Sequence, residues 1–562
     1  MGPGERGGLS QPGGHCRKTA SHPTDPVEAW EISVKATIFT GGPILTSNPT
    51  QPRVEAVLVT GNIIRAVGAL DDVRAIAGPD TEIFDLGGSC LLPGFNDNHT
   101  HPLSFGQSLS QVDASPRAVT TLHGILEAFR ARHAENADGW LLGRGYDDTR
   151  LDVQRHPTRD ELDTVSADRP ILLVRTCGHL GVANSAALAL AGIDDTTPDP
   201  QGGQIDRDAR GRATGLLRET ALKLVQGVIP EPSLDDLRRY ACAAGQVFRS
   251  QGITSVADAS VTRPEQLAAY QSLARDGALP MRVYTMHLID DMLDTLRELG
   301  IQTGFGDAWL RIGPAKVFQD GSGGGRTAAM FEPYPDQPEN RGITYYDQQE
   351  LNERFESAHA AGFQLAAHAI GDRAIMMILD AYQHALGNAV TSDHRARIEH
   401  CGMCTPAILG KLRDLKVFAA PQPTFVHYLG DSYLRNFTER QLTLAYPLHA
   451  YEQEGIPFSL SSDVPVTPCD SMVNLHAAVT RKTQDGDDMA PGQAITMESA
   501  LRAYTAGGAF GSFEERIKGT LEPGKLADMA VVSHDPTAID SEAIPEIRVL
   551  RTILDGNTVY EA

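Results

Sequence analysis

The sequence predicts an α/β protein whose centre is a (β/α)8 TIM barrel, with a small β-sandwich domain formed by both chain ends. A large insertion is expected after barrel strand 1. Three observations predict this architecture. Eight short apolar runs in the middle of the chain end in polar or reactive residues, helical stretches separate them, and β-rich segments occur near both ends.

The two chain ends are expected to build one domain. Short β-type runs with the turn signals TGN and DGN occur in residues 31–92 and 514–562, which predicts a composite β-sandwich. Residues 93–513 then form the barrel, and the tract at about 103–247 is the insertion beside its mouth. Residues 1–30 are rich in Gly, Pro and polar residues, and we expect a disordered leader there.

Each predicted barrel strand ends in chemically useful side chains. In order, the runs are LLPGFNDNHTH, ITSVADAS, MRVYTMH, AKVFQDGS, QLAAHAIGD, RARIEHC, KVFAAPQP and FSLSSDVP. The active site of a (β/α)8 barrel lies at the C-terminal ends of its strands. The polar ends of these eight runs should therefore meet at one mouth.

These strand ends carry candidate metal ligands. Residues two apart in a strand point to the same face, so His99 and His101 should project together, as should Lys316 and Asp320. The six candidate ligands are His99, His101, Lys316, His368, His400 and Asp463. Imidazole and carboxylate suit zinc or a similar divalent ion. A lysine ammonium would repel it, so Lys316 fits as a carbamate formed with CO2, which could bridge two ions; a salt bridge with Asp320 is the alternative.

Several long motifs make the chain similar to a known family. They are GFNDNHTHP, AKVFQDGSGGGRTAAM, AAHAIGDRA, RIEHC, SSDVPV and GTLEPGKLADMAVV, with VRTCGHLGVANSAAL and GRGYDDTRL in the predicted insertion. Across residues 31–562 the chain resembles the amidohydrolase superfamily. The resemblance is greater to its family 3, the branch typified by N-substituted formamide deformylase.

The resemblance implies a role for each candidate ligand. His99, His101 and Asp463 would hold the more buried of two zinc or similar divalent ions, and carboxylated Lys316 would bridge them. The two remaining histidines of the set would bind the second ion. A water or hydroxide between the ions would attack a carbonyl, and Asp463 would take its proton and pass it to the leaving nitrogen. A mononuclear site that uses only some of these ligands is the alternative.

Four further residues are candidate substrate contacts: His179, Gln422, Asp320 and Tyr146. Gln422 ends the seventh strand, where it would contact substrate or only shape the pocket. His179 lies in the insertion, and an ordinary histidine is the alternative there. The run DGSGGGRTA lacks the phosphate-loop pattern and predicts a mobile loop over the mouth. CGMC has the spacing of a redox motif, but two buried or free thiols are the favoured interpretation.

The predicted function is metal-dependent hydrolysis of a non-peptide C–N bond, in an amide or formamide of a small organic molecule. A lactone or ester, a carbamate or a cyclic amidine could be cleaved by the same site. A catalytically silent scaffold of the same fold is the other class of function, but all six ligand positions are filled, which favours an enzyme. The net charge of −23 argues against nucleic acid and anionic membranes as partners. Seven scattered cysteines fit a reducing compartment, so we expect a cytoplasmic protein, and the resemblance suggests a homodimer.

Overall fold

The computed structural model describes residues 35–562 apart from residues 117, 136–138, 176–177, 388–389 and 391. The predicted leader, residues 1–30, lies outside the described residues. Ala36–Ala562 form one compact unit. Among the helices that the structure describes, none has both the length and the apolar character needed to span a bilayer.

Seven parallel strands form a nearly closed barrel sheet with the order β20-β19-β18-β17-β16-β15-β8. They are β8 (Phe95–Thr100), β15 (Ile253–Val261), β16 (Arg282–Leu288), β17 (Leu310–Phe318), β18 (Leu365–Ala369), β19 (Arg397–His400) and β20 (Phe418–Ala420). Each overlaps one of the first seven predicted runs. The α/β class and the parallel barrel-type sheet are therefore confirmed, with seven regular strands among the described residues.

The eighth predicted run, segment 458–465, lies in the gap between β20 and β8 without forming a regular strand. On one side the Ser459 amide donates to the Ala419 carbonyl at 3.1 Å, and on the other the Asp463 amide donates to the His99 carbonyl at 2.9 Å. Asp463 has a left-handed φ of 59°, which breaks the extended conformation that a continuous ladder requires. The segment thus links the two edges of the sheet while turning at Asp463.

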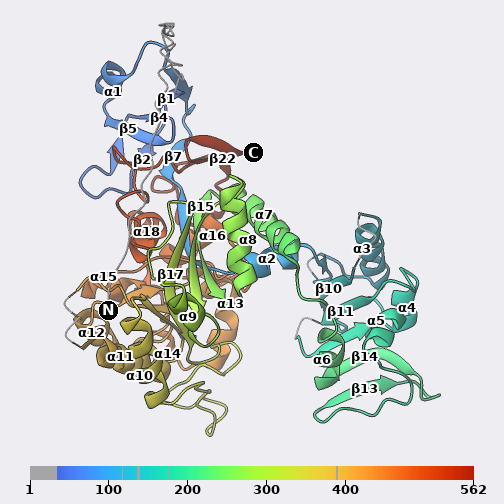
Figure 1. Cartoon of the computed structure of the whole chain (residues 1–562). Helices are drawn as coiled ribbons and strands as arrows, with labels where there is room; N and C mark the ends of the chain where they lie inside the picture. Colours follow the sequence, from blue (N-terminus) through green and yellow to red (C-terminus); the bar gives the residue numbers. More distant parts are fainter. Residues whose placement is uncertain (1–34, 117, 136–138, 176–177, 388–389, 391) are drawn as a thin grey trace, which may run out of the picture. The chain divides into compact units, whose positions relative to one another are not determined.

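Helices alternate with the barrel strands along the chain (Figure 1). They are α7 (Leu234–Ser250) before β15, α8 (Pro264–Arg275) after β15, α9 (Ile289–Glu298) after β16, α10 (Gln348–Ala360) after β17, α11 (Asp372–Leu386) after β18, α12 (Pro406–Asp414) after β19, α13 (Pro423–Asn436), α14 (Glu439–Leu442) and α15 (Leu448–Glu454) after β20, and α16 (Ser471–Thr480) after segment 458–465. Side chains along a barrel strand point alternately outward, toward the helices, and inward, into the barrel. Ala315 and Val317 of β17 pack in the large apolar core, so the intervening Lys316 points into the barrel.

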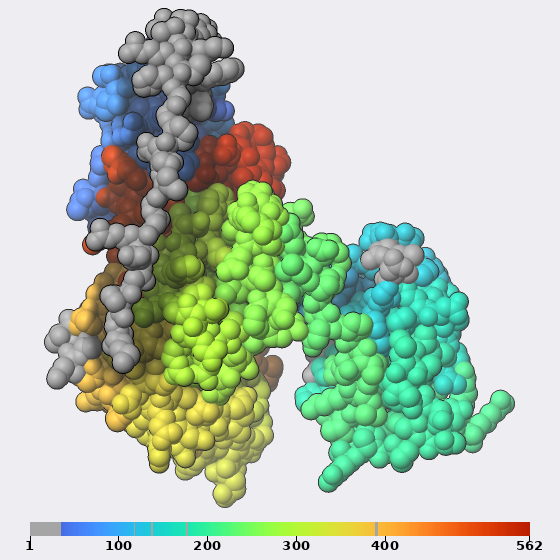
Figure 2. Space-filling model, in the orientation of Figure 1, coloured from blue at the N-terminus to red at the C-terminus, as the bar shows by residue number. Residues whose placement is uncertain are grey.

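Strands from both chain ends share one six-stranded sheet with the order β23-β22-β21-β7-β2-β3. Its strands are β2 (Ile44–Leu45), β3 (Arg53–Val54), β7 (Cys90–Pro93), β21 (Met529–Val532), β22 (Val549–Leu554) and β23 (Asn557–Glu561). A four-stranded sheet, β5-β4-β1-β6, comprises β1 (Ala36–Thr40), β4 (Ala56–Thr60), β5 (Ile63–Gly68) and β6 (Glu82–Asp85). Phe39 and Val57 of one sheet pack in the same core as Met529 and Val531 of the other. Figure 2 shows the last residues, in red, against the first strands, in blue.

A third sheet, β13-β14-β12-β11-β10-β9, falls within the tract predicted as the insertion. Its strands are β9 (Val112–Asp113), β10 (Leu141–Tyr146), β11 (Ile171–Arg175), β12 (Leu180–Ala183), β13 (Gly203–Arg207) and β14 (Ala213–Glu219). Its helices are α3 (Leu122–Glu135), α4 (Arg159–Asp163), α5 (Ser185–Leu190) and α6 (Thr220–Gln226). The remaining helices are α1 (Leu70–Ile76), α2 (Pro102–Leu109), α17 (Met497–Arg502), α18 (Gly508–Gly511), and the short η2 (Pro491–Gln493), η3 (Ala503–Gly507) and η4 (Ser541–Glu546). The insertion has apolar cores of its own, around Phe129 and around Leu217.

Candidate metal centre

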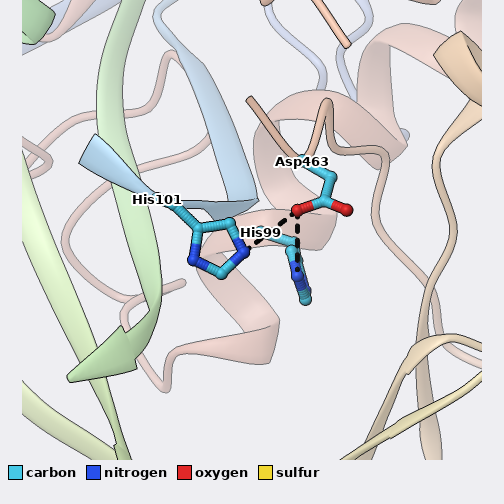
Figure 3. A group of neighbouring side chains, drawn as sticks. All are labelled: His99, His101 and Asp463. Atoms are coloured by element: carbon cyan, nitrogen blue, oxygen red, sulfur yellow. Dashed lines mark ion pairs between the residues drawn. The ribbon is translucent and has the colours of Figure 1, made fainter. Parts of the chain in front are cut away.

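The end of β8 and segment 458–465 bring three ligand-type side chains together (Figure 3). His99 Nε2 lies 3.4 Å and His101 Nε2 lies 3.1 Å from Asp463 Oδ1. Ligand atoms of all three residues lie within 4.8 Å of one another. His99 and Asp463 are buried, whereas the His101 side chain is 21% exposed. Two imidazoles and one carboxylate at this spacing are suited to a divalent metal ion.

The donor set fits a cation because lone pairs converge on one point. His99 Nδ1 contacts the Glu399 carboxylate, so the proton of a neutral His99 belongs on Nδ1 and the Nε2 lone pair faces Asp463. Asp463 Oδ1 is buried, and among the described residues it accepts no well-aligned hydrogen bond. Burial would raise the pKa of Asp463, but His99 and His101 hold that pKa well below its usual range. Asp463 is therefore a carboxylate at neutral pH, which a metal ligand requires.

A second pair of histidines adjoins this group. The His400 ring centroid lies 4.8 Å from that of His99 and 4.4 Å from that of His368. Burial, and then the nearby His368 and His99, lower the pKa of His400 well below its usual value, so it is the neutral imidazole that binds metals. His400 Nδ1 lies 2.7 Å from Gln422 Oε1, which leaves Nε2 as the atom available to a metal.

Lys316 is buried inside the barrel. Its Nζ donates to the Ala259 carbonyl at 2.9 Å, and no ion pair joins it to Asp320 in the part of the chain that the structure describes. Burial lowers the pKa of Lys316 to about 8, although Glu399 and Asp463 act in the opposite direction. A substantial fraction of Lys316 is therefore a neutral amine near pH 8, and the neutral amine is the form that reacts with CO2.

Asp320 lies at the end of β17, beside the histidine of β18. Its Oδ1 is 3.2 Å from His368 Nδ1. The same carboxylate accepts hydrogen bonds from the amides of Ala329, at 2.9 Å, Ile370, at 3.0 Å, and Gly371, at 2.7 Å. Asp320 thus fixes the loop after β17 against the start of α11, and it contacts His368 without a well-aligned hydrogen bond to His368 Nδ1 among the described residues.

Two carboxylates of the site were not among the predicted residues. Glu399 is fully buried between His99 and Arg397; burial would raise the pKa of Glu399, but Arg397 and His99 hold it far below its usual value. Asp97 accepts a hydrogen bond from the Ser462 amide at 2.9 Å, which fixes the segment that carries Asp463, and burial raises the pKa of Asp97 to about 6. Charged residues at alternate positions of an otherwise apolar strand, as in RIEH, were the signal that could have identified Glu399.

The two insertion candidates, Tyr146 and His179, contact residues of the insertion itself. Tyr146 ends β10 in the buried core of the insertion, with its hydroxyl 3.0 Å from His156 Nδ1. His179 lies just before β12, with its side chain 67% exposed and Nδ1 3.0 Å from a carboxylate oxygen of Glu219. Their role as substrate contacts stays a prediction.

The remaining motifs take structural positions beside the centre. The glycine-rich loop after β17 packs on α13: the Asn436 amide donates to the carbonyls of Gly323 and Gly324, and a Cβ on Gly323 would lie 2.6 Å from the Tyr433 hydroxyl. In CGMC the sulfur atoms of Cys401 and Cys404 are 3.5 Å apart, and both cysteines are free and buried. Burial raises the pKa of the Cys404 thiol, which disfavours thiolate chemistry.

A family model described as the amidohydrolase family matches residues 82–560. The chain belongs to the amidohydrolase family. Putative amidohydrolase YtcJ of Bacillus subtilis (strain 168) is 30% identical over 539 residues, which cover 93% of this chain and 99% of YtcJ. N-substituted formamide deformylase of Arthrobacter pascens is 31% identical over 526 residues, which cover 90% of this chain and 95% of that enzyme. These relatives confirm the predicted resemblance to family 3.

A solved structure agrees with the family. An uncharacterized metal-dependent hydrolase from Pyrococcus furiosus superposes with a TM-score of 0.76 at 31% identity, covering 89% of this chain and all of that one. Together with the group formed by His99, His101 and Asp463, the comparisons show a metal-dependent hydrolase of the amidohydrolase family.

Proposed function

We propose that this chain hydrolyses a non-peptide C–N bond, in an amide or formamide of a small organic molecule. The observation that carries the proposal is the convergence of His99, His101 and Asp463, with lone pairs directed at one point inside the barrel mouth. The similarity to N-substituted formamide deformylase over nearly the whole chain supports the type of bond.

The metal would be zinc or a similar divalent ion, most simply two ions. The residues that would hold it are His99, His101 and Asp463 for one ion, His368 and His400 for the other, and carboxylated Lys316 between them. When bound, such ions activate a water molecule and polarise the carbonyl that it attacks. The barrel supplies the ligands in their metal-binding forms, because His400 is neutral and Asp463 is ionised.

Asp463 would move the proton. Because Asp463 is ionised, one of its carboxylate oxygens can accept the proton of the attacking water and then donate it to the leaving nitrogen. Hydrolysis of a formamide in this way gives formate and an amine, with one water consumed. Gln422 and Asp320 would keep His400 and His368 in place, and substrate contacts from Gln422, Asp320, Tyr146 and His179 are part of the proposal.

We also propose that the chain forms a (β/α)8 barrel in which segment 458–465 takes the place of the eighth strand. The sandwich of both chain ends and the insertion would flank it. The same site could act on a lactone or ester, a carbamate or a cyclic amidine, since all are attacked by activated water. We also keep the cytoplasmic location and the homodimer as predictions.

The test combines metal content with a substrate panel. Purified protein should contain one to two divalent ions per chain by elemental mass spectrometry and lose activity with a chelator. N-substituted formamides, N-acyl amines, lactones and carbamates should then be compared by kcat/KM. Full activity of metal-free protein would refute the mechanism, and faster turnover of lactones than of every amide would move the bond to the alternative class.

A further inference from the structure

Two buried histidines of the centre, His99 and His400, are supported by different chemical groups. His99 Nδ1 contacts a carboxylate oxygen of Glu399, whereas His400 Nδ1 lies 2.7 Å from the amide oxygen of Gln422. All four side chains are buried. Each histidine therefore uses Nδ1 for its support and keeps Nε2 for a metal, but one support carries a charge and the other does not.

The carboxylate support is rigid. Arg397 contacts both oxygens of Glu399, with Nη2 3.0 Å from Oε2. The same guanidinium donates to the Asn98 carbonyl at 2.8 Å and to the Asn98 side-chain oxygen at 3.1 Å. Asn98 precedes His99 in β8, so the histidine and its carboxylate are held by one network that crosses from β8 to β19.

The amide support is equally fixed but neutral. The Nε2 of Gln422 donates to the Ala420 carbonyl at 2.7 Å and to the Ser461 hydroxyl at 2.9 Å. Both amide hydrogens are thus used, which forces Oε1 toward His400. Hydrogen bonds hold both supporting side chains in one orientation. The two supports therefore differ in charge.

A carboxylate behind a metal-binding histidine strengthens the metal bond more than a neutral amide does, and removing such a partner typically costs 10- to 100-fold in affinity. The His99 side also has the carboxylate of Asp463 as a candidate ligand, whereas the His368 and His400 side offers imidazoles and the shared Lys316. Asp320 Oδ1 lies 3.2 Å from His368 Nδ1, but His368 Nδ1 makes no well-aligned hydrogen bond among the described residues. Both differences favour tighter metal binding at His99, His101 and Asp463.

We infer that Glu399 and Gln422 make the two metal positions unequal: the ion at His99, His101 and Asp463 is retained, and the ion at His368 and His400 exchanges. Glu399 acts as a positioning residue through His99 and does not itself contact substrate. The inference rests on the proposed metal-dependent function and goes further by assigning an order of loading.

The test is a Zn2+ titration of the metal-free full-length chain against a chromogenic chelator, with native mass spectrometry to count bound ions. Wild-type protein should bind the first ion at least about tenfold more tightly than the second. Glu399→Gln should weaken the first ion by about 10- to 100-fold and spare the second. The matched variant Gln422→Met, of similar size but without the oxygen acceptor, should weaken only the second ion.

This crossed pattern distinguishes positioning from a merely structural role, which would lower the unfolding temperature of the metal-free chain without selecting one ion. If Glu399→Gln does not fold, the double variant Arg397→Met/Glu399→Gln removes the buried charge pair together and serves in its place. If only one ion binds, Glu399→Gln must weaken it and Gln422→Met must not.

Equal affinities for two ions, or a Glu399→Gln chain within twofold of wild type at the first ion, would overturn this inference and leave the hydrolase proposal standing. A folded chain that binds no divalent ion would overturn both.

Discussion

Two buried arginine–carboxylate pairs of the same chemistry lie in different parts of the barrel. Arg282, at the start of β16, pairs with Asp528 just before β21 and with Asp555, the latter at 3.0 Å. Arg397, in β19, pairs with Glu399 beside His99. The first joins the N-terminal end of a barrel strand to the sheet of the chain ends, and the second supports a candidate ligand. Both arginines begin their strands, but the pairing register places Arg397 level with Lys316 and Leu288, six residues beyond Arg282 along β16. The level in the barrel thus separates a pair that serves the fold from one that serves the chemistry.

The largest expected effect is at the mouth. Asp463→Asn removes the proposed proton acceptor but keeps the shape of the side chain, so kcat should fall by about 10²- to 10⁴-fold. Steady-state kinetics on the best formamide, with circular dichroism as the control for folding, measures this. A rate near that of the wild type would remove Asp463 as the proton shuttle.

Breaking the pair of Arg282 and Asp528 should lower the stability of the fold and not the catalytic rate. Arg282→Met leaves Asp528 buried without its charged partner, which should lower the free energy of unfolding by about 3–5 kcal/mol. Urea denaturation measures the loss, and kcat per folded molecule should stay at the wild-type level. If kcat and bound metal fell as well, the distinction between the two pairs would be wrong.

A pH dependence is expected for assembly of the centre. The pKa of Lys316 is lowered to about 8 by burial, so below pH 8 its reactive neutral fraction grows about tenfold per pH unit and levels off above that value. Activation of metal-free protein by Zn2+ and bicarbonate should accelerate accordingly between pH 6 and 8. Lys316→Ala is the control, and a bicarbonate-independent activation would contradict the carbamate.

The smallest effect is expected in the insertion. His179 is largely exposed and paired with Glu219, so His179→Ala should raise KM by no more than a few-fold and leave kcat unchanged. Metal content should not change. A loss of kcat comparable to that of Asp463→Asn would place the insertion within the reaction site.

Strand periodicity predicted much of the site. His99 and His101 do project together, and seven of the eight predicted runs contain barrel strands, because period-two alternation and polar strand ends are local properties of the sequence. The irregular eighth segment was not predictable in this way, since its break depends on the left-handed φ of Asp463.

Long-range contacts explain what periodicity could not predict. His400 has the same parity as Ile398, which packs outward in the core; a left-handed φ of 69° at His400 changes the direction of the chain at this point. Glu399 supports His99 across 300 residues of sequence, and the Ser462 contact of Asp97 spans 365. No local pattern specifies such partners.

The sheet of the chain ends has a consequence for how the protein is made. Arg53 of β3 and Asp535, just beyond β21, hydrogen-bond although they lie 482 residues apart, and β21 lies between β7 and β22. During synthesis the edge of β7 that pairs with β21 stays unpaired until nearly the whole chain has left the ribosome. We therefore expect newly made chains to depend on chaperones that shield this edge, with co-translational folding beginning in the barrel or the insertion.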